Sequence, residues 1–514
     1  MTLDSTVRNT LVDIPGPLPK SERVLAWAIW IFHSIMAFVI SAWVSSGKLR
    51  IWLESHHWVK NSTYTNSYQM DLSDPEWLYY RETIIHLLIS YSIHSALILL
   101  VRKTTSSYSE LLIIIIGFAC QVHMTSVQCI VVLYSFAAVV YLATCQLKGT
   151  LRAAIAWILC ILFITKSVQY IPFTVGGQIF YREFNVYLYG AFKILNYNLH
   201  LCANPTNHPP ILESLQYFAY LPYSMTLIVT YEDFSAQLRL PVVHFNFFRS
   251  ALRLIFWYFA FEMLLHVVHV NAIFNGPPDV LKDLNVYEIA AVSYVCGQLF
   301  YLKYVIIFGV PAFFAGLDGM KPPNAPICIS RVSLYSRMWR YFDNGLYSFL
   351  KTHVYIPLMK KPLPFYLSCL RNISALIAVF GVVLAWHGTR THYICWVSLS
   401  AVELIIERVG YSIWKLEWIQ QIRKRLGEHF CRRIIATTML LTVTPGIFGV
   451  FFFLGQEGIG QTILDKVVVQ GVHDVFTGNI GFLPITSGFG FLHILILGYF
   501  FNNVCLDIEI YYKS

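Results

Sequence analysis

Two polar residues able to move protons stand in apolar and aromatic surroundings. Asp343 lies in the stretch MWRYFDNGLYSFL, four residues after Trp339. His387 ends an apolar run in VVLAWHGTRTHYICW and directly follows Trp386. An imidazole can act as a general base near neutral pH, and a carboxylate can orient that imidazole or a substrate amine. A carboxylate at membrane depth costs at least about 2.5 kcal/mol. We therefore expect Asp343 to be paired with another group or to take part in a reaction.

Each of these two residues also has a purely structural interpretation. Asp343 could cap a helix at the level of the lipid headgroups, just ahead of Gly345. His387 could be a buried histidine bonded to a backbone carbonyl group. The two residues are 44 positions apart, so the sequence alone does not place them in contact.

A second polar group is formed by Glu262, His266 and His269 in the stretch EMLLHVVHV. Histidines three positions apart could hold a metal ion on one face of a helix. No HExxH pattern accompanies them, and a polar stripe facing neighbouring helices explains the three residues better. We therefore predict no metal site here.

The elements that position these residues belong to a membrane protein. Of the 514 residues 56% are hydrophobic and 13% charged, against about 25% charged in soluble domains, and the mean hydropathy is +0.57. A bilayer-spanning helix needs about 20 mostly apolar residues. We predict an all-α, polytopic integral membrane protein with about ten transmembrane helices, plus re-entrant or interfacial helices, around an intramembrane reaction chamber. The expected spans are Val24–Val44, Ile84–Val101, Leu111–Leu147, Ala153–Thr165, Ala251–Ile273, Val286–Leu317, Ile373–Trp386, Tyr393–Ile406, Ile434–Leu454 and Phe489–Phe501.

The organisation of the chain follows from what interrupts these spans. Leu111–Leu147 is too long for one span, and its polar centre predicts either two spans with a turn or one span plus a re-entrant piece. The segment Trp414–Arg433 mixes tryptophan with many cations, which predicts a helix lying in the interface plane. No long linker or internal repeat is present, so we treat residues 1–514 as a single domain. The other polar segments are Ser45–Thr83, Gln178–Leu212 and Asp318–Leu370.

Charge and cysteine content exclude several classes of protein. The net charge of +9 is modest, and the basic residues cluster where the chain should leave the bilayer. This favours contact with membrane lipid headgroups over nucleic-acid binding. The eleven cysteines form no CxxC pair, which argues against a disulfide scaffold or a zinc cluster.

One long stretch and one short motif carry a family resemblance. The run FYLKYVIIFGVPAFFAGLDGMKPPNAPICISRVSLYSRMWRYFDNGLYSFLKTHVYIPL, Phe300–Leu358, is followed by the WHG of residues 386–388. Together they resemble the core of the membrane-bound O-acyltransferase superfamily. The pieces WRYFD, GLYSFL, VYIPL and WHG, and the upstream SDPEWLYY of Ser73–Tyr80, most resemble its Hedgehog acyltransferase branch, the protein-cysteine N-palmitoyltransferases. The resemblance is clear over about Ala251–Trp396.

The resemblance implies roles for the polar residues. His387 would be the general base, and Asp343 would hold either the acceptor's N-terminus or the imidazole. Trp339 and Trp386 would wall the site and exclude water. The donor would be palmitoyl-CoA and the acceptor the N-terminal cysteine of a secreted signalling protein of Hedgehog type. The place implied for this reaction is the endoplasmic reticulum membrane.

The resemblance also implies a haem, bound through Cys328, which lies fifteen positions before Asp343. A single thiolate can serve as an axial haem ligand. The alternative is a free cysteine that follows a proline-rich turn. The phosphates of CoA need cations, for which Arg331, Arg337 and Arg340 lie nearby in the sequence.

One departure from the family branch keeps the acceptor open. Ser224–Leu227, SMTL, stands where that branch carries a His-Asn-Gly-Pro piece. The alternative acceptors are a lysophospholipid and a serine of another secreted peptide. A non-catalytic regulatory relative is a further alternative, and the presence of His387 counts against it. A transporter would require paired repeats and several charged residues within the spans.

Overall fold

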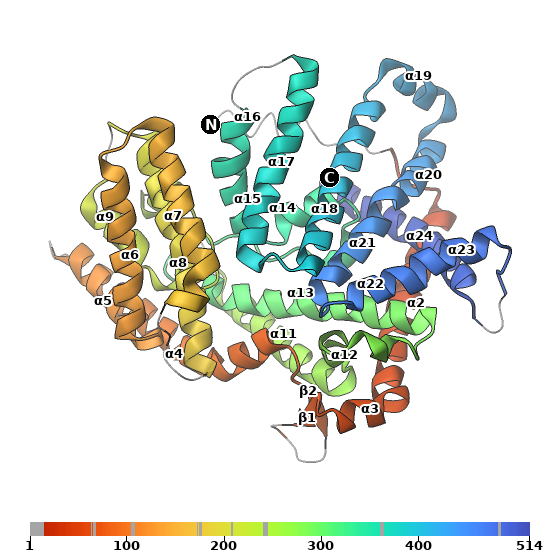
Figure 1. Cartoon of the computed structure of the whole chain (residues 1–514), viewed down its shortest axis with the longest axis horizontal. Helices are drawn as coiled ribbons and strands as arrows, with labels where there is room; N and C mark the ends of the chain where they lie inside the picture. Colours follow the sequence, from red (N-terminus) through yellow and green to blue (C-terminus); the bar gives the residue numbers. More distant parts are fainter. Residues whose placement is uncertain are drawn as a thin grey trace.

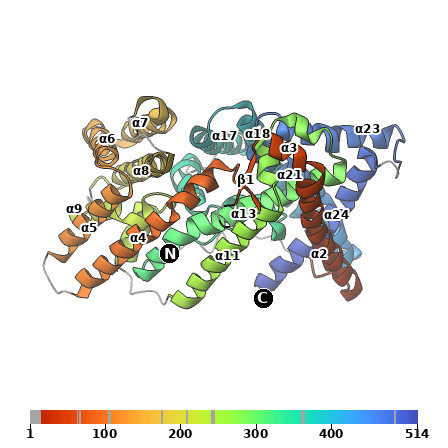
Figure 2. The same ribbon diagram turned by 90° about the horizontal axis from the view of Figure 1, so that it is seen from below.

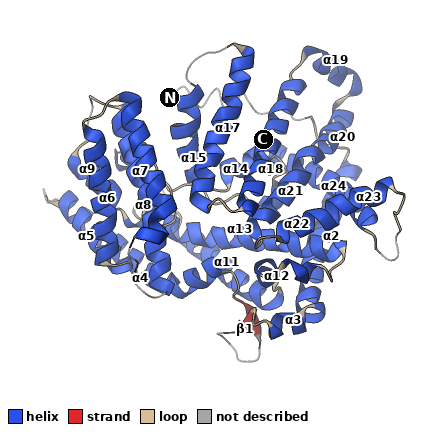
Figure 3. Cartoon of the chain, viewed as in Figure 1, coloured by secondary structure: helices blue, strands red, loops and turns tan. Residues whose placement is uncertain are grey.

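The computed structural model describes residues 15–513, except for 63, 65–67, 104–107, 172, 174–176, 207–208, 240–244, 360–363 and 482–484. Almost all of this part of the chain is helical (Figure 3). Its one sheet is an antiparallel pair of short strands, β1 (Val59–Asn61) and β2 (Gln69–Asp71). The prediction of an all-α, multi-pass membrane protein is confirmed.

Long apolar helices make up most of the bundle. In the part of the chain that the structure describes, nine helices are long and apolar enough to cross a bilayer, and α5 is a shorter apolar helix. This agrees with about ten expected spans. The long helices are α2 (Lys20–Trp43), α4 (Pro75–Lys103), α5 (Ser109–Met124), α6 (Val127–Cys145), α7 (Gly149–Tyr170), α8 (Gly177–Ala203), α11 (Phe247–Val267), α13 (Val286–Leu317), α17 (Phe365–His387), α18 (Thr391–Trp414), α20 (Glu428–Thr438), α21 (Leu440–Leu454) and α24 (Ser487–Lys513).

Short helices and turns connect the long ones. The α-helical pieces are α3 (Arg50–Ser55), α9 (Ile211–Ala219), α10 (Tyr231–Arg239), α12 (Val270–Asn275), α14 (Tyr335–Tyr341), α15 (Asn344–Leu350), α16 (Ile356–Met359), α19 (Glu417–Leu426), α22 (Ile459–Leu464) and α23 (Gln470–Phe476). Three π-helical turns are η1 (Val44–Lys48), η5 (Lys351–Tyr355) and η6 (Asp465–Val469), and three 3₁₀ turns are η2 (Leu221–Tyr223), η3 (Pro278–Leu281) and η4 (Ile329–Arg331).

The long apolar run Leu111–Leu147 is two helices with a turn, the first of the two arrangements expected. α5 ends at Met124, and α6 begins after Ser126, whose hydroxyl accepts the backbone N–H of Cys129 at 3.1 Å. A serine cap satisfies one of the free N–H groups at a helix start. The polar centre of the run is therefore a helix boundary.

The segment Gln178–Leu212 is not the polar connection that its composition predicted. It is mostly the helix α8, and most of the described residues of that helix are buried. Several of its polar side chains have partners inside the bundle: Lys193 Nζ donates to the Tyr217 carbonyl at 2.8 Å, and Asn198 Nδ2 donates to the Ile194 carbonyl at 2.8 Å. Average hydropathy missed this helix because it does not register partners for buried polar groups.

The helix α13 lies across the middle of the molecule (Figure 1). The helices α4 to α9 stand to one side of it, α15 and α17 rise from its centre, and α18 to α24 stand at the other side, an order that the second view repeats (Figure 2). A capping box starts α13, because Asn285 and Glu288 each accept the other's backbone N–H. Its bounds equal those of the expected span, and most of its length is buried.

The N-terminal residues of the described chain are attached to α20. The Gly16 N–H donates to Glu428 at 2.7 Å, and Arg433 Nε donates to Glu22 at 3.0 Å. Beside them, the fully buried Arg432 pairs with Asp507 of α24 at 2.8 Å. These contacts join α2, α20 and α24 at one end of the bundle.

The amphipathic segment Trp414–Arg433 contains the exposed helix α19, none of whose residues is buried. Its apolar side chains Trp418 and Ile422 are 56% and 41% exposed. Tryptophan and aliphatic residues that no other helix covers, next to the cations Lys424 and Arg425, suit a helix lying at a membrane interface.

Candidate active site

Asp343 stands between the two short helices α14 and α15. It is the N-cap of α15, and one of its carboxylate oxygens accepts the Leu346 N–H at 2.9 Å. The helix-capping role weighed from the sequence is thus real. The Gly345 N–H also interacts with this carboxylate. The residue is therefore held at the start of α15 by backbone N–H groups, and a carboxylate has further acceptor sites beyond two such bonds.

The start of α15 is seated closely on the segment that precedes α10. A side-chain carbon on Gly345 would lie 2.2 Å from the carbonyl oxygen of Ile228. Only glycine permits this approach of one backbone to another. The segment that departs from the family branch, Ser224–Leu227, ends one residue before this contact and is buried. It thus lies beside the helix that Asp343 begins.

His387 is the last residue of α17, which ends at Gly388 in a left-handed conformation with φ of 102°. Its ring lies 5.3 Å from the ring of Trp396 and 5.1 Å from that of Phe453, measured between centroids. In the part of the chain that the structure describes, its ring nitrogens make no hydrogen bond, and the residue is only partly buried. The backbone-bonded histidine weighed from the sequence is therefore not what the structure has.

A chain of aromatic rings connects the two polar residues. Phe453, which contacts His387, lies 5.5 Å from Phe300, and Phe300 stacks on Phe342 at 5.5 Å with 8° between the ring planes. Phe342 directly precedes Asp343. The fold thus brings Asp343 and His387, 44 positions apart in the chain, to one aromatic cluster. No hydrogen bond or ion pair joins Asp343 to His387 in the described structure.

The two tryptophans expected beside the site lie on different walls of it. Trp339 stacks on Trp396 at 5.5 Å, so it lies near the ring that contacts His387. Trp386 instead turns toward α8, with its ring 4.9 Å from Tyr189 and 4.8 Å from Phe192. These two residues of α8 escaped the sequence analysis. Their only signal is the recurrence of buried residues every three or four positions, which marks a helix face.

An ionic cluster around the buried Lys303 borders Asp343 through aromatic contacts. Lys303, in the middle of α13, lies 2.7 Å from Asp74 and 2.8 Å from Glu76. Tyr304 donates its hydroxyl to Glu76 at 3.0 Å, and its ring lies 5.9 Å from Phe342. The sequence showed Lys303 only as an interruption of an apolar run. Its partners are more than 200 positions away, so no local pattern could reveal them.

The region of Cys328 does not fit a haem on its own. Burial raises the pKa of the Cys328 thiol, although Ser330 and Arg331 act in the opposite direction. A raised pKa disfavours the thiolate that would bind iron. Among the described residues no group of three or more His, Cys, Asp or Glu side chains could hold a metal ion. The haem expectation gains no support, and no step below passes through one.

The three arginines considered for CoA differ in their surroundings. Arg337 pairs with Glu509 at 2.7 Å, and Arg331 donates to the Tyr512 hydroxyl at 3.1 Å. Arg340 lies over the ring of Tyr347, 5.5 Å from its centroid. None of these contacts selects a phosphate-binding residue.

Glu262 and His266, considered for metal binding, belong to a structural network. Glu262 accepts the Trp77 indole N–H at 2.9 Å and Arg81 Nε at 2.7 Å. His266 Nε2 lies 2.8 Å from the Ser62 hydroxyl. The carboxylate is therefore neutralised by a guanidinium, and the group holds α4 and α11 to the chain next to β1, as the polar-stripe interpretation expected.

Comparison with known proteins gives the family. Residues 25–439 match the model of MBOAT, the membrane-bound O-acyltransferase family. The chain belongs to this family. The match contains both Asp343 and His387 and covers most of the chain. The fold described here is therefore that of an acyltransferase.

Three curated relatives are similar to this family member. It is 24% identical over 448 residues to the mouse protein-cysteine N-palmitoyltransferase HHAT, covering 80% of this chain and 86% of that protein. It is 27% identical over 326 residues to the Drosophila melanogaster protein-cysteine N-palmitoyltransferase Rasp, covering 62% and 63%. The third is the mouse HHAT-like protein, 24% identical over 258 residues, covering 48% and 49%. The matched region is therefore under two thirds of the Rasp sequence.

Proposed function

We propose that this enzyme transfers a long-chain acyl group, palmitoyl, from acyl-CoA to the N-terminal cysteine of a secreted protein at the endoplasmic reticulum membrane. The observation that carries this proposal is the placement of His387. Its imidazole has no hydrogen-bond partner among the described residues and lies in the aromatic cluster that Asp343 borders. The names of the relatives HHAT and Rasp support the choice of a cysteine acceptor.

His387 acts as the general base in this proposal. The thioester carbonyl of the donor is already activated, so the nucleophile must be brought to it and must lose a proton. His387 takes the proton from the attacking group, the C–S bond of the thioester breaks, and the proton passes to the CoA thiolate. The product is an amide, formed either directly or through a cysteine thioester that rearranges to the neighbouring amine. The rings of Trp339, Trp396 and Phe453 keep water from the thioester.

Asp343 positions the acceptor rather than the imidazole. Of the two roles considered, orientation of His387 would need a hydrogen bond between them, which the described structure lacks. Beyond its bonds to backbone N–H groups, the Asp343 carboxylate has acceptor sites for a hydrogen bond from the acceptor's terminal amine. A charge-assisted hydrogen bond of this kind is about twice as strong as a neutral one. It would hold the amine near the thioester.

The experiment is acyl transfer in detergent with labelled palmitoyl-CoA. The acceptors are a peptide that begins Cys-Gly and the same peptide beginning Ala-Gly, and His387→Ala and Asp343→Asn run beside the parent chain. We expect transfer to the cysteine peptide only, and loss of transfer in both variants at unchanged melting temperature. Transfer to neither peptide would refute the cysteine acceptor and favour a lysophospholipid, a serine peptide or a regulatory role. Transfer that survives His387→Ala would refute the assigned base.

A further inference from the structure

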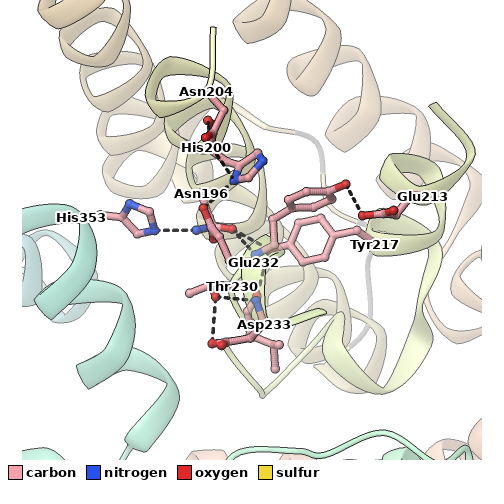
Figure 4. A network of polar contacts seen from close by, with 11 residues as sticks. Asn196, His200, Asn204, Glu213, Tyr217, Thr230, Glu232, Asp233 and His353 are labelled. Atoms are coloured by element: carbon pink, nitrogen blue, oxygen red, sulfur yellow. Dashed lines mark hydrogen bonds and ion pairs between the residues drawn. The ribbon is translucent and has the colours of Figure 1, made fainter. Parts of the chain in front are cut away.

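The helix that Asp343 begins is fixed at its far end by a polar network. α15 continues without a break into η5, so Asn344–Tyr355 is one helical segment. His353, near its end, points at Asn196 of α8 (Figure 4). The His353 Nε2 atom lies 2.7 Å from Asn196 Nδ2. A π-helical turn such as η5 is rare and is often found near functional sites.

The bonds of Asn196 determine which way its amide faces. Its Oδ1 atom accepts the backbone N–H of Tyr231 at 2.6 Å and the hydroxyl of Tyr217 at 3.3 Å. A backbone N–H can only donate, so Oδ1 must face Tyr231 and the NH₂ group must face His353. His353 Nε2 therefore accepts, which requires the neutral imidazole with its proton on Nδ1. A protonated His353 would oppose a donor to a donor and break this bond.

Asn196 also holds the surface on which α15 sits. By accepting the Tyr231 N–H it fixes the start of α10, and Tyr217 donates to the carbonyl of Val229 at 3.0 Å. The neighbouring residue Ile228 places its carbonyl oxygen against Gly345, two residues after Asp343. One buried amide thus joins both ends of the Asp343 helix to α8.

We propose that Asn196 and His353 are positioning residues for acyl transfer, which together hold the α15–η5 segment so that Asp343 can meet the acceptor, and that they do so only while His353 is neutral. The proposal rests on the proposed function, because acyl transfer is one of its readouts. Neither residue touches the reacting atoms.

The charges around His353 set the direction of its response to pH. Burial lowers the pKa of His353, Glu232 of α10 opposes this shift, and His200 of α8 adds to it. His200 Nδ1 is itself 2.7 Å from Glu232. The nearby Tyr217 and Tyr231 hydroxyls donate to Val229 and Glu213.

The sign of the effect follows from the lowered pKa. A histidine that binds its proton less readily when docked leaves docking at full strength above its ordinary pKa of about 6.5. Docking then weakens as the pH falls from there towards the lowered value. We therefore expect the α15–η5 segment to loosen in mild acid.

The first test compares the acid side of the pH–rate profile. In the parent chain we expect the logarithm of kcat to fall with a slope near two, since His387 and His353 must both lose a proton. His353→Gln replaces the accepting nitrogen by an amide oxygen and should retain transfer near pH 7.5 with a slope near one. Asn196→Asp can pair with either form of His353, so the slope of its profile should also fall from near two to near one. His473→Gln, at a 72% exposed side chain, is the control and should match the parent.

The second test does not depend on acyl transfer. Hydrogen exchange of residues 344–355, corrected for the intrinsic rate, should rise between pH 7.5 and 5.5 in the parent and not in His353→Gln. The proposal would be overturned if hydrogen exchange changed equally with pH in the parent and in His353→Gln. It would also be overturned if the acid sides of their pH–rate profiles had the same slope. If the parent shows this exchange but transfers no palmitoyl group to the cysteine peptide, the positioning pair stands and the proposed acceptor fails.

Discussion

The carboxylate of Asp343 has more acceptor sites than the fold uses. One oxygen caps α15 through the Leu346 N–H, and in our proposal a remaining site accepts from the amine of the acceptor. An asparagine caps a helix about as well as an aspartate, but it carries no charge to attract an ammonium group. Capping and catalysis can therefore be separated at this position.

Asp343→Asn is expected to keep the stability of the parent chain and to lose at least about 100-fold in acyl transfer. Asp343→Ala should lose acyl transfer and also about 1 kcal/mol of stability, because the helix cap is missing. Melting temperature and initial rates in the same detergent measure the two effects. If Asp343→Asn transfers acyl groups at the parental rate, the carboxylate has only a structural role.

Gly345 provides a test of the close contact between the start of α15 and the Ile228 carbonyl group. Gly345→Ala would place a carbon 2.2 Å from the Ile228 carbonyl oxygen, and backbone at both sides leaves little room to move. We expect a loss of about 1–3 kcal/mol, as for overpacked sites, together with reduced transfer. Gly381→Ala in α17 meets nothing within 4 Å and should instead gain about 0.5–1 kcal/mol of helix preference. Thermal unfolding of the two variants gives the comparison, and equal melting temperatures would contradict it.

At the scale of the elements, α13 and the start of α4 are joined by the cluster of the buried Lys303 with the partly exposed Asp74 and Glu76. Removing the lysine leaves two carboxylates without their cation. The cluster therefore holds the SDPEWLYY segment against the helix that crosses the molecule.

Lys303→Met should destabilise the protein by about 1–3 kcal/mol, because the carboxylates that lose their partner are partly exposed to solvent. Adding Asp74→Asn and Glu76→Gln to that variant should restore part of the loss, because the stranded charges disappear. Lys282→Met, whose partner Asp279 is 76% exposed, is the matched control and should leave the melting temperature unchanged. A triple variant no more stable than Lys303→Met would show that the lost ion pair is not the cause.

The elements also show what a sequence can and cannot predict here. The bounds of α13 were predictable because its apolar run, Val286–Leu317, lies between the polar residues Asn285 and Asp318. α8 was not, since Lys193 and Asn196 lower its hydropathy and find their partners in α9 and α10, elements beyond the helix itself.

The same distinction holds at the candidate site. Asp343 and His387 were visible as polar residues in apolar runs beside a familiar motif. Tyr189 and Phe192, which contact Trp386, were not, because they join the site through a fold in which α8 and α17 lie about 200 positions apart in the chain. The network around His353 was invisible for the same reason.

At the scale of the whole molecule, the two ends of α18 differ in charge. The connection of residues 388–390 beside His387 carries one cation, Arg390. The connection at the other end leads through α19 into α20 and is strongly basic. Its cations are Lys415, Arg423, Lys424, Arg425, Arg432 and Arg433. Under the positive-inside rule the basic end is cytosolic. The His387 end of α17 then faces the other side, where our proposal places the acceptor.

This orientation predicts the fate of an inserted glycosylation site. An Asn-Gly-Thr acceptor on a flexible linker placed after Arg390 should receive a glycan, and the same insert after Gly427 should not. A shift on a gel that glycosidase removes is the measurement. The reverse pattern would place His387 on the cytosolic side and exclude a secreted acceptor at that end.

The contacts of Gly16 and Glu22 with α20 can form only late in synthesis. Gly16 and Glu428 are 412 positions apart, and a ribosome adding about 5–20 residues per second needs roughly 20–80 s to cover that interval. Among the described helices α2 is made before its partners α20 and α24, which lie about 400 or more positions later in the chain. The stretch that carries Asp343 and His387 leaves the ribosome before this closure. The residues of the candidate site are thus made before the contacts that join α2 to α20 and α24 can form.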